Sequence, residues 1–360
     1  MNTIEVRPVR PEDEAAWDEV AKSSDDAWLT HSWIWNVAIE EGVMSGKGRR
    51  LVVVRDGRLV GIVPQHLHSY RRGPFVRRIL YSNYWAGGGT ALVNDVVGEA
   101  RAECFAAARR ATLEQARRDG ADKLMLFLPP LARHNLNGKQ EARRALADGF
   151  VDRSSSALVV RLAGRTKKEI WDAMEGRGRT KARKAERAGV CVAPAPVAGA
   201  LDTLYALHLE TCSRTGASPD PREYFEATLA TGHFHVFLAY LDEKPIGALM
   251  LALYEGRALF DVAASSQDAL RLGANNLLIW RALEWLVDAE AEAFELGVLP
   301  IGGQPVSRKM ASIAWHHRSF GGEEVPAYRG ELVFRRGREF VFGLARQVLA
   351  RAGRVESETL

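Results

Sequence analysis

Two stretches of this chain repeat one hairpin pattern at a constant offset, and this repeat constrains the fold more than any other feature. Residues 52–67 and 237–253 each contain two apolar runs joined by a short polar turn. Apolar runs that flank an Asp-containing turn are typical of β-hairpins. The matching positions are Asp56 with Asp242, Arg58 with Lys244, and Gly61 with Gly247. The matches indicate two copies of one hairpin.

The elements around the two hairpins also follow one order. A helical pattern precedes each hairpin, at residues 11–24 and 201–216, and a longer amphipathic helix with a short strand follows it. In the second half, the apolar residues of the helix predicted at 274–291 recur on one face, as a helix packed on a core requires. This order, repeated once, predicts an α/β protein of two tandem domains, each with a mixed central sheet flanked by helices.

The predicted domain organisation has three parts. They are a first domain at residues 1–160, a second domain at 161–328 and a C-terminal segment at 329–360. Residues 154–162 are a predicted strand, and Thr166 with Glu169 forms a T-x-x-E capping box that begins the next helix. The C-terminal segment contains a predicted strand at 330–336 and an amphipathic helix near 338–352. We expect both to pack back on the core, and the polar tail after them to fray.

The composition is that of a globular protein without a membrane span or an export signal. The chain has 360 residues, of which 47% are hydrophobic and 26% charged, and its net charge is +4. A single core stops growing at about 250–300 residues, so two domains are expected. No apolar run reaches the ~18 residues of a membrane helix, and the N-terminus lacks a signal-peptide pattern. Cys104, Cys191 and Cys212 fit neither a disulfide framework nor a zinc site, which favours a cytoplasmic location.

A basic segment lies at the start of the second half, at residues 175–192. Its cationic residues are Arg177, Arg179, Lys181, Arg183, Lys184 and Arg187. Residues 180–188 are compatible with a helix that ends at Gly189. One interpretation is a solvated helix. The other is an anion site, since several converging cations bind phosphate and Arg engages it bidentately. Gly176 and Gly178 would then let the backbone approach the ligand closely.

Three further motifs stand in order along the chain. They are H-S-x-x-W with His31, Ser32 and Trp35; Trp171 and the basic segment with Ala185, Gly189 and Val190; and Phe320, Gly321 and Gly322. Together they resemble, over nearly the whole chain, the FemAB-like branch of the GNAT acyltransferase superfamily. That branch has an early Q-S-x-x-W segment, a tryptophan helix before a basic helix with an A-x-x-x-G-V turn, and a late F-G-G segment.

The resemblance implies a twin-GNAT fold and the transfer of an amino acid from aminoacyl-tRNA onto an amine. The best-known members use a peptidoglycan precursor as acceptor, and relatives use small molecules. Two positions depart from the bridge-forming members. Ile39 replaces a lysine near the nucleotide end of the acceptor, and His316-His317 replaces a Phe-Lys pair near the reaction centre. These departures favour a small-molecule or peptide amine as acceptor.

His317 and Asp261 are the candidate catalytic residues. A protonated His317 would stabilise an oxyanion and a neutral one would act as a base, while the alternative is a histidine at the edge of the core. Asp261, in the strand predicted at 258–265, is a second candidate base or a structural hydrogen-bonding carboxylate. The glycine run at 87–89 would bring the backbone close to a ligand or form a simple turn. The residues assigned to the acceptor pocket are Tyr84, Trp85, Gly88 and His316.

The prediction of the acyl donor depends on the absence of a CoA-binding loop from this sequence. The resemblance places the CoA diphosphate of GNAT acetyltransferases on a Q/R-x-x-G-x-G/A loop at a helix N-terminus. In residues 265–278, Arg271 and Gly273 are present, but their spacing differs and the second glycine is absent. Together with the basic segment, this favours aminoacylated tRNA held through its phosphates, with no cofactor.

Two other functions stay open at this point. One is an acyl-CoA-dependent N-acyltransferase of the same fold, and the other is a non-catalytic RNA- or polyanion-binding module. Two histidine pairs, 66 with 68 and 233 with 235, each lie on one face of a predicted strand. Neither has a recognisable third ligand nearby, so we expect no metal site.

Overall fold

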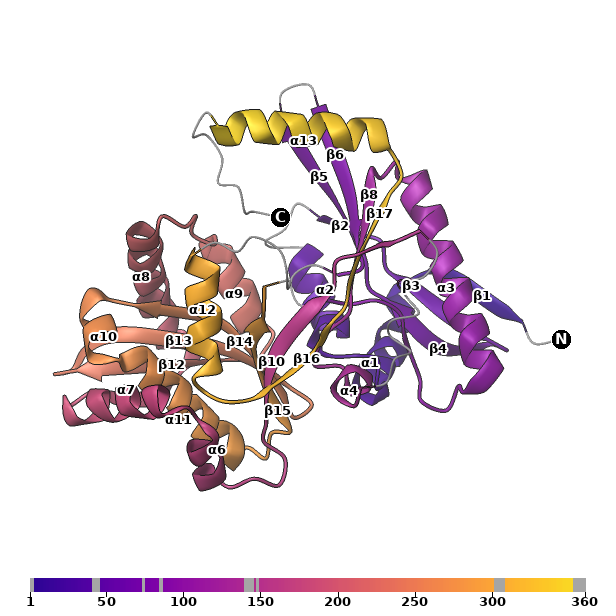
Figure 1. Cartoon of the computed structure of the whole chain (residues 1–360). Helices are drawn as coiled ribbons and strands as arrows, with labels where there is room; N and C mark the ends of the chain where they lie inside the picture. Colours follow the sequence, from indigo (N-terminus) through magenta and orange to yellow (C-terminus); the bar gives the residue numbers. More distant parts are fainter. Residues whose placement is uncertain are drawn as a thin grey trace.

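Two α/β units that share strands make up the protein, as a computed structural model shows (Figure 1). The structure describes residues 3–40, 46–72, 75–83, 87–138, 146, 149–300 and 308–351. Tyr84, Trp85 and the polar C-terminal tail lie outside these residues. The predicted α/β class is confirmed.

The first half contains short strands around one long helix. Its strands are β1 (Ile4–Pro8), β2 (Gly46–Gly48), β3 (Leu51–Arg55), β4 (Arg58–Val63), β5 (His66–Arg72), β6 (Phe75–Tyr81), β7 (Ala91–Leu92), β8 (Lys123–Phe127), β9 (Val151–Asp152) and β10 (Ser155–Arg161). Its helices are α1 (Glu14–Ser23), α2 (Trp33–Ala38), α3 (Gly98–Arg118) and α4 (Arg133–Leu136), with 3-10 turns η1 (Pro11–Asp13) and η2 (Leu29–His31).

The second half has longer strands and more helices. Its strands are β11 (Cys191–Ala195), β12 (Phe234–Leu241), β13 (Lys244–Tyr254), β14 (Arg257–Ser265), β15 (Ala293–Val298), β16 (Glu323–Ala327) and β17 (Arg329–Val333). Its helices are α6 (Lys167–Ala173), α7 (Gly176–Arg187), α8 (Val197–Thr215), α9 (Arg222–Ala230), α10 (Gln267–Leu272), α11 (Ala274–Asp288), α12 (Arg308–Arg318) and α13 (Arg336–Arg351). The capping box of Thr166 and Glu169 at the start of α6 is present as expected.

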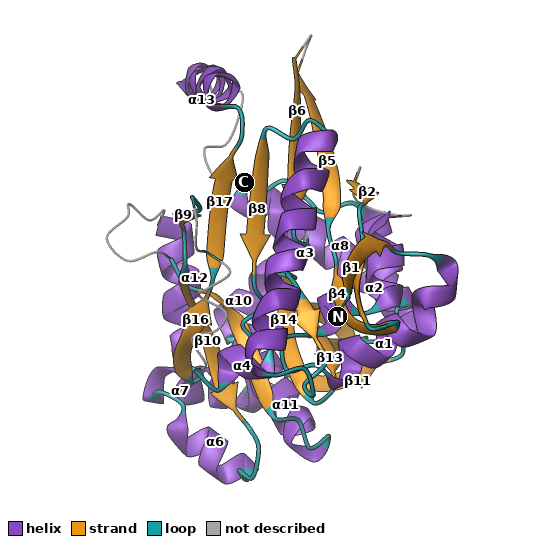
Figure 2. Ribbon diagram, turned by 90° about the vertical axis from the view of Figure 1, so that its right-hand side faces the viewer, coloured by secondary structure: helices purple, strands orange, loops and turns teal. Residues whose placement is uncertain are grey.

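Each half gives one strand to a sheet of the other half (Figure 2). The sheets in the described residues have the strand orders β1-β3-β4-β7, β2-β5-β6-β8-β17-β9 and β11-β12-β13-β14-β15-β10-β16. β10 is antiparallel to both β15 and β16, and β17 is antiparallel to both β8 and β9. The predicted boundary at residue 160 therefore falls inside β10, a strand of the seven-stranded sheet.

The two hairpins share details that confirm the repeat. Both turns place two consecutive residues at positive φ, Asp56 and Gly57 in the first and Asp242 and Glu243 in the second, as type I′ turns require. The registers of both hairpins shift at equivalent positions, next to Gly61 and next to Gly247. The same bulge thus occurs at the same offset, which a chance match of turn residues would not produce.

The C-terminal elements lie on the first half. The predicted strand and helix are observed as β17 and α13, and α13 crosses the ends of β5, β6 and β8 (Figure 1). Glu339 of α13 accepts hydrogen bonds from Arg77 at 2.8 and 2.6 Å and lies 3.6 Å from the Lys123 ammonium. None of the helices in the described part of the chain combines the length and apolar character needed to cross a bilayer.

A buried seam joins the two halves. Trp28 and Arg257 are both fully buried, and the Trp28 indole N–H donates to the Arg257 carbonyl at 3.2 Å. The Arg257 guanidinium in turn donates to the carbonyls of Ala27 and Leu131, at 3.0 and 2.8 Å. Trp28 and Trp35 belong to the same apolar cluster as the strands of the seven-stranded sheet. The halves therefore share one continuous core on this side of the sheet.

We expect the alanine substitution of Gly61 to destabilise the fold more than that of Gly247. A Cβ at Gly61 would lie 2.4 Å from Leu92 Cδ2 and 3.2 Å from the Ala91 carbonyl oxygen, whereas one at Gly247 would meet Leu278 Cδ1 at 3.1 Å. Overpacking of this kind costs about 1–3 kcal/mol for Gly61→Ala, and less for Gly247→Ala. Urea unfolding measures both.

Gly199→Ala is the matched control for the hairpin glycines. Gly199 lies in α8 with nothing within 4 Å of an added Cβ. This variant should be as stable as the unmodified protein or gain up to about 1 kcal/mol. If Gly61→Ala and Gly199→Ala unfold at the same urea concentration, the bulge does not need a glycine.

Candidate active site

The seven-stranded sheet opens between two of its central strands. β14 and β15 are parallel, but they pair only through residues 257–259 and 293–295. Beyond this point the register shifts leave Asp261 of β14 without a partner on β13, and Leu296 of β15 without one on β10. Residues 260–263 are partly exposed although they lie in the middle of the sheet. Bulges bend strands and re-aim side chains, so an opening forms where β14 and β15 diverge.

His317 lies at this opening. It belongs to α12, and its ring centroid is 5.0 Å from that of Phe260. Gly297 of β15 lies next to the imidazole, because a Cβ built on it would be 3.8 Å from His317 Nδ1. Burial, with a smaller contribution from His316, lowers the pKa of His317 to about 4. The imidazole is therefore neutral at pH 7, which argues against the protonated, oxyanion-binding form that the sequence left open.

Asp261 faces the other side of β14 from the His317 contact. The Tyr224 hydroxyl of α9 lies 2.9 and 3.0 Å from its two carboxylate oxygens. Burial raises the pKa of Asp261 to about 7, and the hydrogen bond from Tyr224 opposes this rise only in part. A carboxylate that titrates near pH 7 suits a general base. The hydrogen bond expected of a structural carboxylate is present as well, so the two interpretations coexist.

Glu295 is a buried carboxyl that the sequence analysis did not select. It lies on β15 opposite Leu259, just before the strands diverge, and is 3% exposed. Burial raises its pKa to about 8, against the opposing effect of the Arg329 charge. The sequence feature that could have identified it is a single carboxyl residue inside the apolar run of residues 293–296. Glu295 is protonated at pH 7 and can donate a hydrogen bond there.

The basic helix α7 packs on α11 through its small residues. Gly178, Ala182 and Ala185 recur on one face and are buried. A Cβ on Gly178 would lie 2.6 Å from the Ser319 carbonyl oxygen. The helix begins at Gly176, earlier than the predicted start at residue 180. Gly176 and Gly178 therefore lie within the helix and do not flank it, and Gly178 is needed for contact with the chain after α12.

Two of the six predicted phosphate ligands cap neighbouring helices. Arg179 donates to the carbonyls of Asp172 and Met174 at the C-terminal end of α6. Lys184 donates to the Arg271 carbonyl of α10 at 2.6 Å. Helix C-terminal carbonyls lack intrahelical partners, and cationic side chains satisfy them well. Arg179 and Lys184 thus stabilise the C-terminal ends of α6 and α10.

The other cations of α7 stay near its surface. The Arg177 guanidinium lies 3.5 Å from the ring centroid of Trp315 and donates to the Trp315 carbonyl at 2.8 Å. The Lys181 ammonium lies 5.6 Å from the same ring. Arg183 lies over Trp171 at 5.1 Å, and Arg187 is exposed without a hydrogen bond or ion pair to the described residues. Arg177 and Lys181 therefore face α12, whereas Arg183 faces α6.

Trp315 is the residue that the sequence analysis missed on α12. Trp315 is 52% exposed, which leaves much of its large aromatic ring open to solvent. It directly precedes His316, whose pKa is lowered to about 4 by burial and by the charges of Lys181 and Arg177. The structure thus brings part of the basic helix next to the histidine pair. The sequence feature that could have identified Trp315 is its position directly before two histidines.

The N-terminal end of α11 is crowded by other elements. The short helix α10 directly precedes it, and the Arg271 side chain pairs with Asp268. A Cβ on Gly273, the N-cap of α11, would lie 2.9 Å from the Lys181 carbonyl oxygen. The backbone of α7 therefore lies directly beside the first turn of α11. This agrees with the absence of a CoA-type loop in the sequence.

The glycine run 87–89 lies against the end of β8. A Cβ on Gly87 would lie 2.9 Å from the carbonyl carbon of Leu128, and one on Gly88 would lie 2.5 Å from the Ser82 carbonyl oxygen. The Gly88 N–H donates to the Phe127 carbonyl at 2.8 Å. Backbone packing requires glycine here, independently of any ligand. Tyr84 and Trp85, predicted beside Gly88 in the acceptor pocket, are outside the described residues.

The histidine pairs do not form metal sites in the described residues, where no cluster of three or more His, Cys, Asp or Glu side chains could hold an ion. His66 and His68 are both buried on β5.

Comparisons with known proteins agree with this architecture. Residues 175–305 match the family model described as an acetyltransferase (GNAT) domain. The crystal structure of FemX is 13% identical, covers 94% of this chain and 99% of its own, and gives a TM-score of 0.66. No curated protein matches this sequence.

Two other solved structures match this chain over a similar share of its length. The C-terminal domain of a putative lysylphosphatidylglycerol synthetase from Agrobacterium fabrum is 15% identical, with a TM-score of 0.54, over 94% of this chain and 96% of its own. A tandem GNAT protein from the clavulanic acid biosynthesis pathway is 13% identical, with a TM-score of 0.52, over 92% of this chain and 98% of its own. The chain thus shares the fold of FemX and of the tandem GNAT protein, and the twin-GNAT fold that the resemblance implied is confirmed.

Proposed function

We propose that this protein transfers an aminoacyl group from aminoacyl-tRNA to an amine of a small molecule or peptide. One observation carries the proposal. The exposed ring of Trp315 lies beside Arg177 and Lys181, and His317 of the same helix lies at the opening between β14 and β15. An aromatic and cationic surface next to a reactive opening suits a donor in which the acyl group is attached to the end of a nucleic acid.

Trp315 and the cations of α7 fit the end of a tRNA acceptor stem. A base stacked on an exposed aromatic ring contributes about 1–3 kcal/mol, and every base has a face to offer. Lys181, Arg183 and Arg187 are exposed and can neutralise phosphates, which releases counterions and makes binding depend on salt. In this assignment Arg179 and Lys184 position α6 and α10, and do not bind phosphate.

The acyl-CoA alternative is supported less. A CoA diphosphate needs free backbone N–H groups at a helix N-terminus. At α11 the neighbouring α7 backbone approaches Gly273 closely, and Arg271 is paired with Asp268. The GNAT family match and the tandem GNAT neighbour keep this alternative as an explicit outcome of the tests below. A non-catalytic polyanion-binding module is the other outcome.

The chemistry requires alignment of two reactants and one relayed proton. The amine nitrogen attacks the ester carbonyl, the C–N bond forms, and the C–O bond to the ribose breaks. Asp261, with its pKa near 7, accepts the proton of the amine and passes it to the leaving ribose oxygen. The neutral His317, which approaches the opening from the opposite face of the sheet, donates an N–H to the carbonyl oxygen as its negative charge develops. Burial of the opening keeps these interactions strong.

Trp315→Ala should weaken binding of charged tRNA about 10-fold, since a stacked base is lost. Lys181→Ala combined with Arg187→Ala should instead reduce the salt dependence of binding. The slope of log K against log salt concentration should become shallower by about one to two units. Filter binding over a salt series measures both effects. Arg222→Ala, an exposed cation on α9, is the control and should leave both values unaltered. Equal binding by the Trp315→Ala variant and the unmodified protein would remove the stacking role.

His317→Ala should lower product formation about 10²-fold or more while tRNA binding stays unaltered, because the histidine acts on the carbonyl and not on the phosphates. The assay incubates the protein with pooled charged tRNA and, separately, with acetyl-CoA, and measures which is consumed in the presence of amines. Consumption of acetyl-CoA alone would establish the alternative function. Binding of tRNA without turnover by the unmodified protein would indicate a binding module.

The rate should rise with pH and level off above about pH 7, because Asp261 acts as a base only when ionised and its pKa is about 7. Tyr224→Phe removes a hydrogen bond that lowers this pKa, so the inflection should move to higher pH. Asp261→Asn should abolish the inflection and reduce the rate at least 10²-fold. A pH–rate profile with the same inflection in Asp261→Asn would exclude Asp261 as the base.

The Asp261 variant also provides a check on stability. The pKa of Asp261 is higher in the folded protein than the ordinary value of about 3.9, so the folded state binds the proton more tightly than the unfolded state. The ionised carboxylate therefore costs stability as pH rises from about 4 to 7. The stability of Asp261→Asn, relative to the unmodified protein, should increase over that range.

A further inference from the structure

The outer side of α13 exposes large apolar side chains to solvent. Phe340, Val341 and Leu344 are 68%, 50% and 47% exposed. Residues three and four apart on a helix are neighbours, so Phe340 and Leu344 lie side by side and Val341 flanks them. Gly337, one turn earlier on the same side, has no atom within 4 Å of an added Cβ. Phe340, Val341 and Leu344 therefore form one open surface, called here the α13 strip.

The opposite side of α13 fixes the helix on the first half. The Arg77 guanidinium of β6 bonds to Glu339 and lies 5.8 Å from the ring centroid of Phe342. Arg338 donates a hydrogen bond to the Val76 carbonyl of the same strand. The strip is therefore exposed on a helix whose other side is held in place. In both views α13 and the basic helix α7 lie at opposite ends of the molecule (Figures 1 and 2).

The first turn of α13 has an excess of positive charge. Arg335 and Arg338 share the single buried carboxylate of Asp122, at 3.9 and 3.2 Å. Arg336 is exposed and has no ion pair with the residues that the structure describes. Three guanidinium groups thus face one carboxylate, which leaves two positive charges uncompensated here.

The strands under α13 add to this excess. Arg77 and Lys123 share the carboxylate of Glu339, at 2.6 and 3.6 Å. Lys123 and Arg153 share the carboxylate of Glu331, each at 3.6 Å. Three cations thus face two carboxylates, and one more positive charge remains uncompensated. An apolar strip set among uncompensated cations requires a partner that is apolar and anionic at once.

An anionic phospholipid bilayer has both properties. Basic amphipathic helices with Phe and Leu on the apolar side lie in the boundary between the headgroups and the acyl chains. The segment 335–351 fits this composition, with five arginines and Glu339 as its single acid. Guanidinium groups engage phosphate oxygens bidentately, and the negative surface potential of such a bilayer attracts the cations.

Two other partners fit the same surface less well. A second copy of the chain, docked strip against strip, would bring two clusters of uncompensated cations together, and like charges at close range repel. A nucleic acid would neutralise the cations but would leave Val341 and Leu344 in water, because it offers no apolar layer to bury them.

We propose that α13 docks the first half on a bilayer that contains anionic phospholipid. The α13 strip enters the boundary of the acyl chains, and Arg336 and the neighbouring cations contact lipid phosphates. The proposal rests on α13 and its surroundings, and is independent of the aminoacyl transfer proposed above.

Co-sedimentation of the full chain with lipid vesicles tests the proposal. Vesicles of phosphatidylcholine with phosphatidylglycerol should bind the protein about 10-fold or more tightly than vesicles of phosphatidylcholine alone, and added salt should weaken this binding. Phe340→Ser combined with Leu344→Ser should weaken it about 10-fold or more, since two apolar side chains no longer enter the bilayer. The matched control is Val97→Ser, an exposed apolar residue at the start of α3, which should bind as the unmodified protein does.

A second pair of variants tests the charge. Arg336→Gln should weaken binding to the mixed vesicles about 5-fold, the contribution of one cation at an anionic surface. Arg110→Gln, an exposed arginine on α3, is the control and should leave binding unaltered. Far-UV circular dichroism confirms that each variant is folded. Aminoacyl transfer to a soluble amine should be equal in the Phe340→Ser/Leu344→Ser variant and the unmodified protein, so docking and transfer are tested separately.

Three results would overturn the assignment. They are the absence of binding to the mixed vesicles, equal binding to the two kinds of vesicle, and equal binding by the Phe340→Ser/Leu344→Ser and Val97→Ser variants. Light scattering after size exclusion tests the other occupant. A dimer that the Phe340→Ser/Leu344→Ser substitutions convert to a monomer would assign the α13 strip to a second copy of the chain and not to a bilayer.

Discussion

The exchange of β10 and β17 between the halves is the constraint on which the other features depend. A strand inserted between two others completes backbone hydrogen bonds on both its edges, so neither sheet is finished without the other half. The exchange also affects the geometry of the candidate site. β10 pairs with β15, and the register shift between them leaves Leu296 unpaired where β14 and β15 diverge. A strand from the first half thus helps to form the opening in the second.

Burial and surface charge divide the site into two environments. Inside the opening, burial shifts the pKa values of His317, Asp261 and Glu295 toward their neutral forms. On the outer surface, the exposed cations of α7 and the ring of Trp315 offer charge and stacking. A polyanionic donor held outside and a neutral amine reacting inside would each meet a suitable environment.

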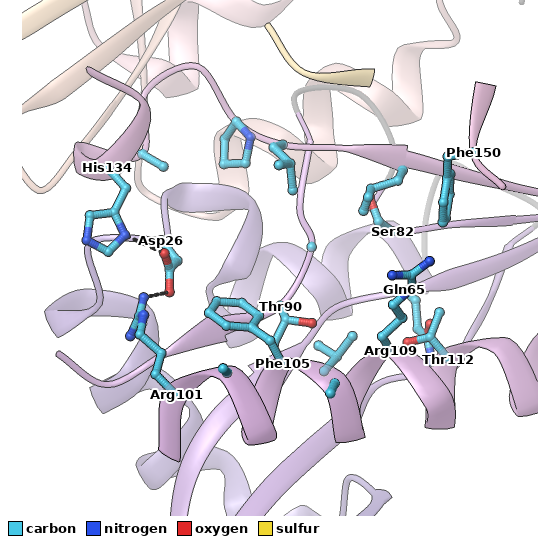
Figure 3. A pocket seen from close by; sticks show the side chains of 18 of the residues that line it. Asp26, Gln65, Ser82, Thr90, Arg101, Phe105, Arg109, Thr112, His134 and Phe150 are labelled. Atoms are coloured by element: carbon cyan, nitrogen blue, oxygen red, sulfur yellow. Dashed lines mark hydrogen bonds and ion pairs between the residues drawn. The ribbon is translucent and has the colours of Figure 1, made fainter. Parts of the chain in front are cut away.

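The two halves use their long helices differently. In the second half, α7 packs on α11 through Gly178, Ala182 and Ala185, and closes that face. In the first half, α3 flanks a cavity also lined by Gln65, whose side-chain amide has no hydrogen-bond partner among the described residues (Figure 3). The same order of elements thus gives a closed helix face in one half and a helix that borders a cavity in the other.

Much of the fold could be predicted because it depends on local patterns. Both hairpins with their turn residues, the capping box of Thr166 and Glu169, and the helix ending at Gly189 each follow from residues within a few positions of one another, and the repeat follows from comparing these local patterns. The order of the motifs was sufficient to indicate the twin-GNAT fold. His317 and Asp261 were also selected from sequence, although their protonation states were not.

The sequence by itself determined the elements, their repetition and the clustering of cations in one helix. Only the tertiary structure decided which sheet receives β10 and β17, which cations cap α6 and α10, and that Trp315 is exposed and Gln65 unpaired. The physical reason is that alternation and helical periodicity specify which face of an element is buried, but not against what. The partners of Arg179, the burial that shifts the pKa of Asp261 and the cavity around Gln65 all arise from segments distant in the chain.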